Sequence, residues 1–176
     1  MRYFVAVRPP PTVIDDIGGM TAGWFGGGEG LVVEPSQRLH VTVRFLGAVT
    51  RTEPLVAALR QGCAAAQPVM VTYGPATIGL TEQALVVPVT GLTGLAEDVQ
   101  DLIEPWGDVP AWRPFVGHLT VARNRRPRRL GGLIPQAWVG VPVGGSWLVE
   151  TMGLFVSEVV AGVPHYRVVE EFPLAG

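Results

Sequence analysis

One short motif occurs twice in this chain and constrains its fold more than any other feature. Residues His40–Val43 read HVTV, residues His118–Val121 read HLTV, and each copy lies in an apolar run typical of a β-strand. Because side chains alternate between the two faces of a strand, each copy presents His and Thr on one face and two apolar residues on the other. We therefore predict two strands that bury their apolar faces and offer two imidazoles and two hydroxyls across one cleft.

Composition and charge limit the classes of protein to which the chain can belong. The chain has 176 residues, of which 48% are hydrophobic and 16% charged, which is typical of a compact globule with one domain or two small lobes sharing a core. The net charge of −2 provides no global basic field of the kind that general nucleic-acid coat proteins have.

The basic residues are all arginines, and several gather around the second motif. These are Arg113, Arg123, Arg125, Arg126, Arg128 and Arg129. The run is typical of a solvated loop, but it also suits a local anion-binding patch, since guanidinium groups bind phosphate through paired donors. The residues alone favour neither interpretation.

Targeting and redox signals are few. Cys63 is the only cysteine, so an intrachain disulfide is excluded. The apolar run Tyr3–Val7 is too short for a signal peptide, and no run approaches the ~20 apolar residues of a membrane span. We expect a cytoplasmic protein with no membrane segment.

Periodicity and chain breakers predict strands and helices in alternation. The expected strands are Met1–Val7, Leu31–Val33, Arg38–Leu46, Val69–Tyr73, Ala84–Val89, Gly117–Ala122, Ser146–Ser157 and His165–Glu170. The expected helices are Thr12–Met20, Thr52–Ala66 and Thr93–Ile103, with a weak helical turn in Arg129–Trp138. Loops are expected at Gly23–Gly30, Glu104–Arg113 and Arg123–Arg129. Each half contains strands, a helix and one motif, which suggests an internal duplication.

The paired histidines suit acid–base chemistry. With an ordinary pKa of about 6.5, one imidazole can serve as a base while the other serves as an acid at neutral pH. A metal site would need a further ligand, and the nearest carboxylates, Glu34 and Asp108, are expected in loops. We therefore expect no metal and no cofactor. The third histidine, His165, has no threonine partner, and we expect it to be structural.

Four blocks of sequence are similar to the 2H phosphoesterase superfamily, in particular to the LigT-like RNA 2′,3′-cyclic phosphodiesterases. The blocks are Arg2–Pro10 (RYFVAVRPP), Leu39–Gly47 (LHVTVRFLG), Gly117–Arg123 (GHLTVAR) and Met152–Leu174 (MGLFVSEVVAGVPHYRVVEEFPL). The resemblance implies an α+β fold with two lobes, each an antiparallel sheet with outer helices, and a central cleft that holds both HxTx strands. It also implies that residues 1–176 form a single 2H phosphoesterase domain made of two similar lobes.

The resemblance further implies metal-independent hydrolysis of a ribose 2′,3′-cyclic phosphate to a 2′-phosphate. By analogy with the family, His118 is the proton acceptor for the attacking water and His40 is the proton donor to the leaving 3′-oxygen. Thr42 and Thr120 donate hydrogen bonds to the phosphate oxygens as charge develops on them. The reverse reaction, with an RNA hydroxyl in place of water, would form a 2′–5′ linkage.

Two arginines are candidates for substrate binding. Arg123 matches the arginine that follows the second motif in the family, but strict strand alternation turns it away from His118. It reaches the cleft only if the strand ends or bulges near Ala122. Arg44 is expected on the same face as His40. Phe4 and Tyr166 can either stack on a base or fill the core, whereas Phe45 is expected in the core.

Three functions remain open on these residues. The first is a phosphodiesterase that acts on RNA ends with a 2′,3′-cyclic phosphate, or on a cyclic nucleotide. The second is an enzyme for a small nucleotide such as ADP-ribose cyclic phosphate, for which a cleft without a basic extension would be expected. The third is a non-catalytic RNA-binding module, which the two intact His-Thr pairs argue against. In each case we expect a monomer.

Overall fold

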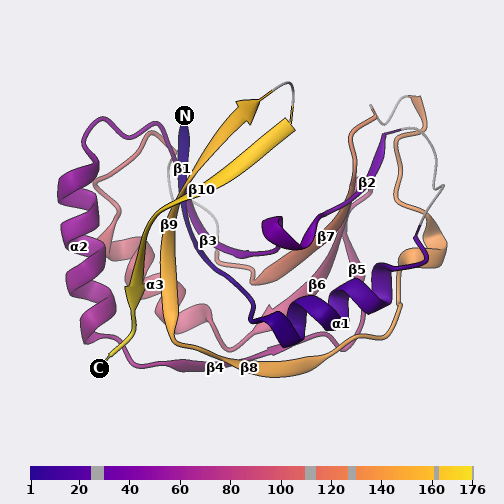
Figure 1. The fold of residues 1–176 in the computed structure, drawn as a ribbon, viewed down its shortest axis with the longest axis horizontal. Helices are drawn as coiled ribbons and strands as arrows, with labels where there is room; N and C mark the ends of the chain where they lie inside the picture. Colours follow the sequence, from indigo (N-terminus) through magenta and orange to yellow (C-terminus); the bar gives the residue numbers. More distant parts are fainter. Residues whose placement is uncertain (25–29, 110–113, 127–129, 161–162, 176) are drawn as a thin grey trace.

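The computed structural model describes residues 1–24, 30–109, 114–126, 130–160 and 163–175. In these residues it contains three α-helices and ten β-strands, which is an α+β architecture (Figure 1). The helices are α1 (Pro11–Thr21), α2 (Thr52–Ala65) and α3 (Thr93–Leu102), and short 3₁₀ helices occupy Ser36–Arg38 and Gln136–Trp138. The strands are β1 (Arg2–Val7), β2 (Leu31–Val33), β3 (Val41–Gly47), β4 (Val69–Tyr73), β5 (Ile78–Thr81), β6 (Ala84–Thr90), β7 (His118–Asn124), β8 (Gly145–Val149), β9 (Thr151–Val160) and β10 (Val163–Pro173).

The described strands form one curled sheet whose neighbours are antiparallel. The main order is β10-β9-β1-β3-β7-β6-β4-β8, while β2 pairs with β7 and β5 pairs with β6. The two motif strands, β3 and β7, are neighbours in the middle, where Val41 and Leu119 form their single registered pair. Figure 1 shows β1, β9 and β10 on one side of this junction and β5 and β6 on the other.

The expectation of two separate sheets is therefore corrected to one sheet with a narrow waist. The two motif strands pair with each other directly, so the ladder continues from one half of the molecule into the other. The waist is narrow because β3 and β7 share one registered pair, Val41 and Leu119, whereas β3 forms five pairs with β1 and β7 forms five with β6.

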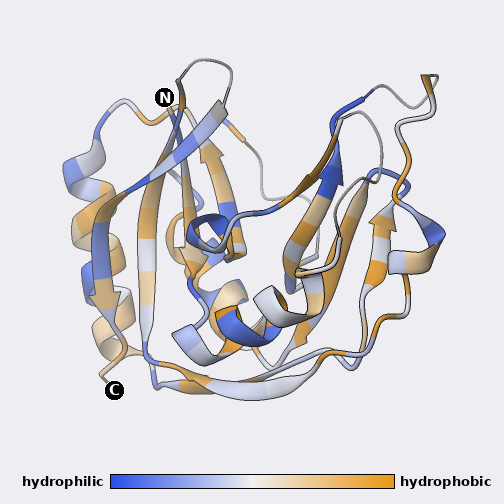
Figure 2. Ribbon diagram, turned by 45° about the vertical axis from the view of Figure 1, so that its right-hand side comes forward, coloured by the Kyte–Doolittle hydropathy of each residue, from blue (hydrophilic) through white to orange (hydrophobic). Residues whose placement is uncertain are grey.

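The three helices bury their apolar sides in one hydrophobic core. This core includes Val13 and Ile17 of α1, Leu55 and Leu59 of α2, and Leu95 and Val99 of α3, with Val41, Val43, Leu119 and Val121 of the motif strands. Helix α2 packs on β10 and α3 on β3, whereas α1 reaches the other half, where the Tyr73 hydroxyl donates to the Asp16 carboxylate. Figure 2 shows hydrophobic and hydrophilic residues mixed along the helices. The opposite face of the motif strands is left for His and Thr.

The three predicted helices are confirmed to within one residue at each end. The prediction of one strand over Ser146–Ser157 is wrong, because Glu150 lies outside any strand and separates β8 from β9. Strand β8 pairs with β4 in one half, whereas β9 pairs with β1 and β10 in the other. Strand β5 was not predicted, and its four residues are all exposed.

Some predictions fall partly or wholly outside the described residues. The glycine-rich segment Gly23–Gly30 does so for residues 25–29, and the arginine cluster does so for Arg113, Arg128 and Arg129. Within the described ranges, the longest helix has 14 residues, and none is long and apolar enough to cross a bilayer.

The waist of the sheet leads to a stability prediction. Leu119 is fully buried and forms the one registered pair between β3 and β7, so Leu119→Ala leaves a cavity at the junction of the two halves. We expect the free energy of unfolding to fall by about 2–5 kcal/mol, measured by urea denaturation. Leu148→Ala, at a position 43% exposed, is the control and should cost far less. Equal effects of the two changes would contradict a central role for this pair.

Candidate active site

A β-bulge follows the threonine of the first motif. Val5 of β1 pairs with Arg44, but the next residue, Ala6, pairs with Thr42, so Val43 is an extra residue. At such a bulge the alternation of side chains shifts by one residue. The carbonyl of Val43 accepts a hydrogen bond of 2.8 Å from the Gln100 side chain of α3, so its acceptor is satisfied outside the ladder.

The second motif contains the same bulge at the same position. Leu85 of β6 pairs with Ala122, whereas the next residue, Val86, pairs with Thr120, which leaves Val121 as the extra residue. Here too an outside donor satisfies the carbonyl, since the backbone N–H of residue 34 donates to the carbonyl oxygen of Val121 at 2.9 Å. The two motif strands thus share one irregularity, not only one sequence pattern.

The first bulge decides the positions of Arg44 and Phe45. Arg44 turns toward α3, where its guanidinium donates to the carbonyl oxygens of Gln100 at 2.8 Å and Glu104 at 3.3 Å, and it is only 6% exposed. The expectation that Arg44 shares the face of His40 was therefore wrong. Phe45, expected in the core, is 60% exposed and borders the cleft. Both differences follow from the shifted alternation.

The second bulge brings Arg123 to the cleft face, in the place that Phe45 has in the first motif. The condition set for Arg123 by the sequence, a bulge near Ala122, is met. Its Nη2 donates to the Thr120 hydroxyl oxygen at 3.2 Å, and its Nε lies 3.5 Å from a Glu34 carboxylate oxygen. Glu34 also binds Arg38, with 3.3 Å between Arg38 Nε and the other carboxylate oxygen.

Both motif histidines are held by the same local hydrogen bond. His40 Nδ1 lies 2.6 Å from the carbonyl oxygen of Arg38, and His118 Nδ1 lies 2.7 Å from that of Val116, in each case two residues earlier. A carbonyl oxygen only accepts, so Nδ1 must carry the proton in both rings. This tautomer leaves Nε2 of each ring available to take or give a proton.

The register of the waist sets how the two motifs face each other. Because Val41 is opposite Leu119 in an antiparallel pair, extending the register by one residue places His40 across from Thr120. By the same rule, His118 lies across from Thr42. Each imidazole is thus next to the hydroxyl of the other motif as well as near its own.

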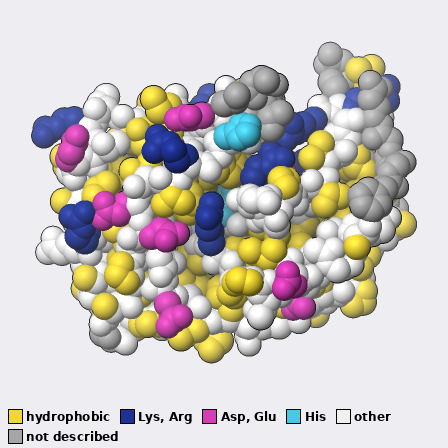
Figure 3. All heavy atoms as spheres, in the orientation of Figure 1, with side chains coloured by type: hydrophobic (Ala, Val, Ile, Leu, Met, Phe, Trp, Pro, Cys, Tyr) yellow, Lys and Arg dark blue, Asp and Glu magenta, His cyan; other side chains and the backbone are white. Residues whose placement is uncertain are grey.

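The predicted site residues gather around one cleft of about 620 Å³. Its lining includes His40, Thr42, Arg44, His118, Thr120 and Arg123, together with Phe45 and Tyr166. Arg44 contributes to the wall, but its guanidinium is bonded to α3. Figure 3 shows one face of the molecule, on which arginine and histidine side chains lie beside one another. Among the residues that the structure describes, no three His, Cys, Asp or Glu side chains form a group that could hold a metal ion.

An aromatic cluster packs against the His40 ring. The Phe4 ring, 3% exposed, lies 5.1 Å from the His40 ring and stacks on Phe155 at 5.3 Å. The Tyr166 ring meets His40 edge-on at 5.4 Å, and the Arg8 guanidinium lies 5.1 Å from the centre of the Phe155 ring. Phe4 therefore fills a small second core, and Tyr166 borders the cleft.

Burial against these rings lowers the pKa of His40 below its ordinary value of 6.5. The positive charges of Arg123, His118 and Arg8 lower this pKa further, while the hydrogen bond to the Arg38 carbonyl partly opposes the effect. The free protein therefore holds His40 mainly neutral at pH 7.

The sequence did not predict that Arg8 and Glu34 lie near the motif residues. It left open whether Tyr166 stacks on a base or fills the core. For Arg8 a signal was available, since it directly follows Val7, the residue of β1 that pairs with Val41. The contacts of Glu34 and Tyr166 depend on β2 and β10 reaching the motif strands, and no local pattern marks them.

Comparison with solved structures gives full-length matches. TT0787 of Thermus thermophilus is 28% identical, with coverage of 100% of this chain and 99% of its own and a TM-score of 0.83. E. coli LigT complexed with 3′-AMP is 23% identical, and the match covers 99% of this chain and 98% of the LigT chain with a TM-score of 0.76. A protein described as a phosphoesterase is 21% identical with the same coverage and TM-score. No family model and no curated protein matches the sequence.

The resemblance stated from the sequence is confirmed at the level of the fold, which matches that of E. coli LigT over the full length of both chains. The LigT-like fold spans the whole chain, and in this chain its sheet brings the two HxTx motifs together at the waist. Other crystal structures of E. coli LigT contain NADP⁺, ATP or phosphate.

The environment of His40 leads to a prediction about its titration. In the free protein, NMR should find the pKa of His40 below 6.5, because burial and nearby cations disfavour the imidazolium. Arg123→Gln removes one of those cations and should raise this pKa. Arg60→Gln, on the outer surface of α2, is the matched control and should leave the pKa of His40 unchanged. A His40 pKa at or above 6.5 in the wild type would refute the assignment of the buried ring.

Proposed function

We propose that this protein is a metal-independent cyclic phosphodiesterase that hydrolyses the 2′,3′-cyclic phosphate at RNA ends to a 2′-phosphate. The observation that carries the proposal is the matched pair of imidazoles, each with Nδ1 bonded to a carbonyl two residues earlier and Nε2 left for the cleft. Binding alone needs no such pair, which argues against a non-catalytic RNA-binding module. The nucleotides and phosphate in the LigT structures support an anionic, nucleotide-like ligand.

In the proposed reaction the two histidines act on opposite sides of the phosphorus. His118 Nε2 takes a proton from a water molecule as the water oxygen attacks phosphorus. The bond from phosphorus to the 3′-oxygen breaks, and His40 Nε2 gives its proton to that oxygen. The products are a 2′-phosphate and a free 3′-hydroxyl, and the protonation states of the two rings are exchanged. A proton transfer through solvent restores them.

A lowered pKa suits His40 to the role of acid. An imidazolium whose pKa is lowered is a stronger proton donor than an ordinary one, and the arriving phosphate anion favours protonation of the His40 ring. The pair titrates as a coupled system, so a pH profile would report values that belong to both rings.

The threonines and Arg123 stabilise the charge that develops on the phosphoryl oxygens. The Thr120 oxygen accepts a hydrogen bond from Arg123, which leaves its own proton free to point toward the substrate. Thr42 lies on the same face as His40 and has the equivalent place in the first motif. Arg123 adds a guanidinium that can hold a phosphate oxygen. Run in reverse with an RNA hydroxyl in place of water, the same groups would form a 2′–5′ linkage.

Substitutions at the motifs test the mechanism. We expect His40→Ala and His118→Ala each to abolish turnover of a 2′,3′-cyclic phosphate, and the double variant to lose little more, because the two rings act as a unit. Thr42→Val and Thr120→Val should each lower kcat by about 10²–10³-fold if each supplies one hydrogen bond to the transition state. Product analysis by ³¹P NMR would identify the 2′-phosphate.

His165→Ala is the matched control, since His165 lies on β10 outside the described lining of the cleft. It should retain full activity, and circular dichroism should show that every variant is folded. Near-normal turnover in either histidine variant of the motifs would refute the two-histidine mechanism.

Chelation tests the absence of a metal from the proposed reaction. We expect the rate of hydrolysis to be unchanged after dialysis against EDTA, because every proton transfer and every hydrogen bond in the proposal comes from a side chain. Loss of activity that Mg²⁺, Mn²⁺ or Zn²⁺ restores would show that the imidazoles serve as ligands instead.

A further inference from the structure

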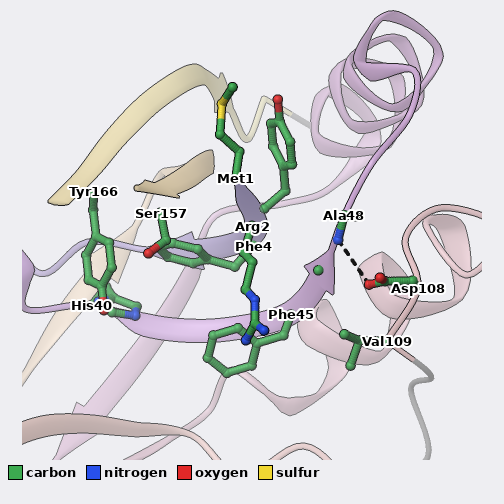
Figure 4. Close-up of a pocket in the computed structure, with 12 residues that line it drawn as sticks. Met1, Arg2, Phe4, His40, Phe45, Ala48, Asp108, Val109, Ser157 and Tyr166 are labelled. Carbon is green, nitrogen blue, oxygen red and sulfur yellow. Dashed lines mark hydrogen bonds between the residues drawn. The ribbon is translucent and has the colours of Figure 1, made fainter. Parts of the chain in front are cut away.

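A second hollow of about 730 Å³ adjoins the cleft along β1 and is assigned no role by the mechanism (Figure 4). It shares His40, Phe45, Val109 and Tyr166 with the cleft, so the two spaces adjoin at the wall that holds the proposed acid. Its volume lies within the range of ~300–1,000 Å³ typical of sites for small organic ligands. A ligand that reacts at His40 can extend into it without leaving the protein surface.

Among the described residues of the hollow, Arg2 supplies a cationic side chain. Arg2 alternates with Phe4 along β1, and Phe4 contacts the His40 ring, so both residues lie on the cleft face. Arg2 pairs with Ser157 of β9, which in turn pairs with Tyr166 of β10, so these three side chains form a row across neighbouring strands. Figure 4 shows Arg2 extending into the hollow toward Phe45. In the described part of the chain, Arg2 has no ion-pair partner.

We propose that this hollow binds the penultimate nucleotide of an RNA chain, with Arg2 on the phosphodiester that joins it to the terminal nucleotide. The substrate class is then an oligoribonucleotide with a 2′,3′-cyclic phosphate end, in preference to a free cyclic mononucleotide. The inference rests on the proposed function and adds a second subsite to it.

The spacing along β1 supports this assignment. Residues two apart on a strand are separated by about 6.6–6.8 Å, so Arg2 lies one such repeat beyond Phe4, the residue beneath His40. That step is of the order of the distance between adjacent phosphates in an RNA chain. With a cyclic phosphate at His40, the proposal places the next phosphate of the chain at Arg2, a position whose spacing along β1 fits it.

The remaining lining suits the uncharged parts of a nucleotide. Phe45 is 60% exposed and lies where the cleft and the hollow meet, so its ring offers a face on which a base can stack. Among the described lining residues, the one carboxylate side chain is Asp108, which accepts a hydrogen bond of 3.0 Å from the backbone N–H of Ala48. Its charge repels a phosphate at that end and leaves a place there for a sugar hydroxyl or a base amino group.

Two substrates and one variant test the proposal. We would measure kcat/KM for adenosine 2′,3′-cyclic phosphate and for the dinucleotide ApA with the same cyclic end. The wild type should prefer the dinucleotide by about tenfold or more, and Arg2→Gln should remove about tenfold of that preference, as the loss of one charged contact. With the wild type, kcat/KM should fall by the same factor when the linkage of the dinucleotide is a neutral methylphosphonate. With Arg2→Gln, that change of linkage should lower kcat/KM little further, since the substitution and the methylphosphonate remove the same contact. Arg60→Gln makes the same change of charge on α2 and should keep the preference.

The outcomes separate this inference from the function on which it rests. Equal kcat/KM for mononucleotide and dinucleotide, or an equal loss on both in Arg2→Gln, would overturn the subsite while leaving the phosphodiesterase proposal intact. A preference for the mononucleotide would overturn it in favour of a small-nucleotide substrate. If the wild type hydrolyses neither substrate, the proposed function and the subsite both fail.

Discussion

The pairing of Val41 with Leu119 is the contact on which the site depends. It is the single registered pair between β3 and β7, and it joins the two halves of the sheet. Both residues are fully buried, so the hydrophobic effect fixes which face of each strand turns inward. Each is preceded by the histidine of its motif. Burying this one pair therefore turns both imidazoles to the opposite face, where they line the same cleft.

The bulges at Val43 and Val121 then give the two halves of the cleft different chemistry. In both strands the bulge turns the residue three positions after the threonine back to the cleft face, and there the two sequences differ. The first motif places Phe45 on that face and the second places Arg123. One wall of the cleft is thus aromatic and the other cationic. A nucleotide has the same two parts, a flat base and a phosphate.

The aromatic cluster of Phe4, Phe155 and Tyr166 determines the electrostatics of the proposed acid. Phe4 and Tyr166 pack against His40 and remove it from water, and this desolvation is the main cause of its lowered pKa. The same packing therefore makes His40 a stronger donor once it is protonated. Arg8 and Arg123 add to the effect and also make the cleft attractive to an anion. The packing around His40 and its lowered pKa thus arise from one small cluster.

Local regularities in the sequence were sufficient for the helices and for the shared face of His and Thr. Alternation over two residues is a property of a strand by itself, so the pairs His40–Thr42 and His118–Thr120 could be placed before any partner strand was known. The apolar runs likewise predicted α1, α2 and α3, because each helix buries one side of its own surface.

Only the tertiary structure decided where the residues after the bulges point. A bulge is defined by the register of the neighbouring strand, β1 for Val43 and β6 for Val121, and these partners are distant in the sequence. Val43 and Phe45 are both apolar, so hydropathy could not tell which of them would be buried. For the same reason Arg44 was expected on the face of His40, but its guanidinium is bonded to α3. The sequence alone determined which residues of each motif strand share a face, because alternation is local. The joining of the two strands at one pair, and the side chains that surround the histidines, depend on contacts between strands and were settled only by the fold.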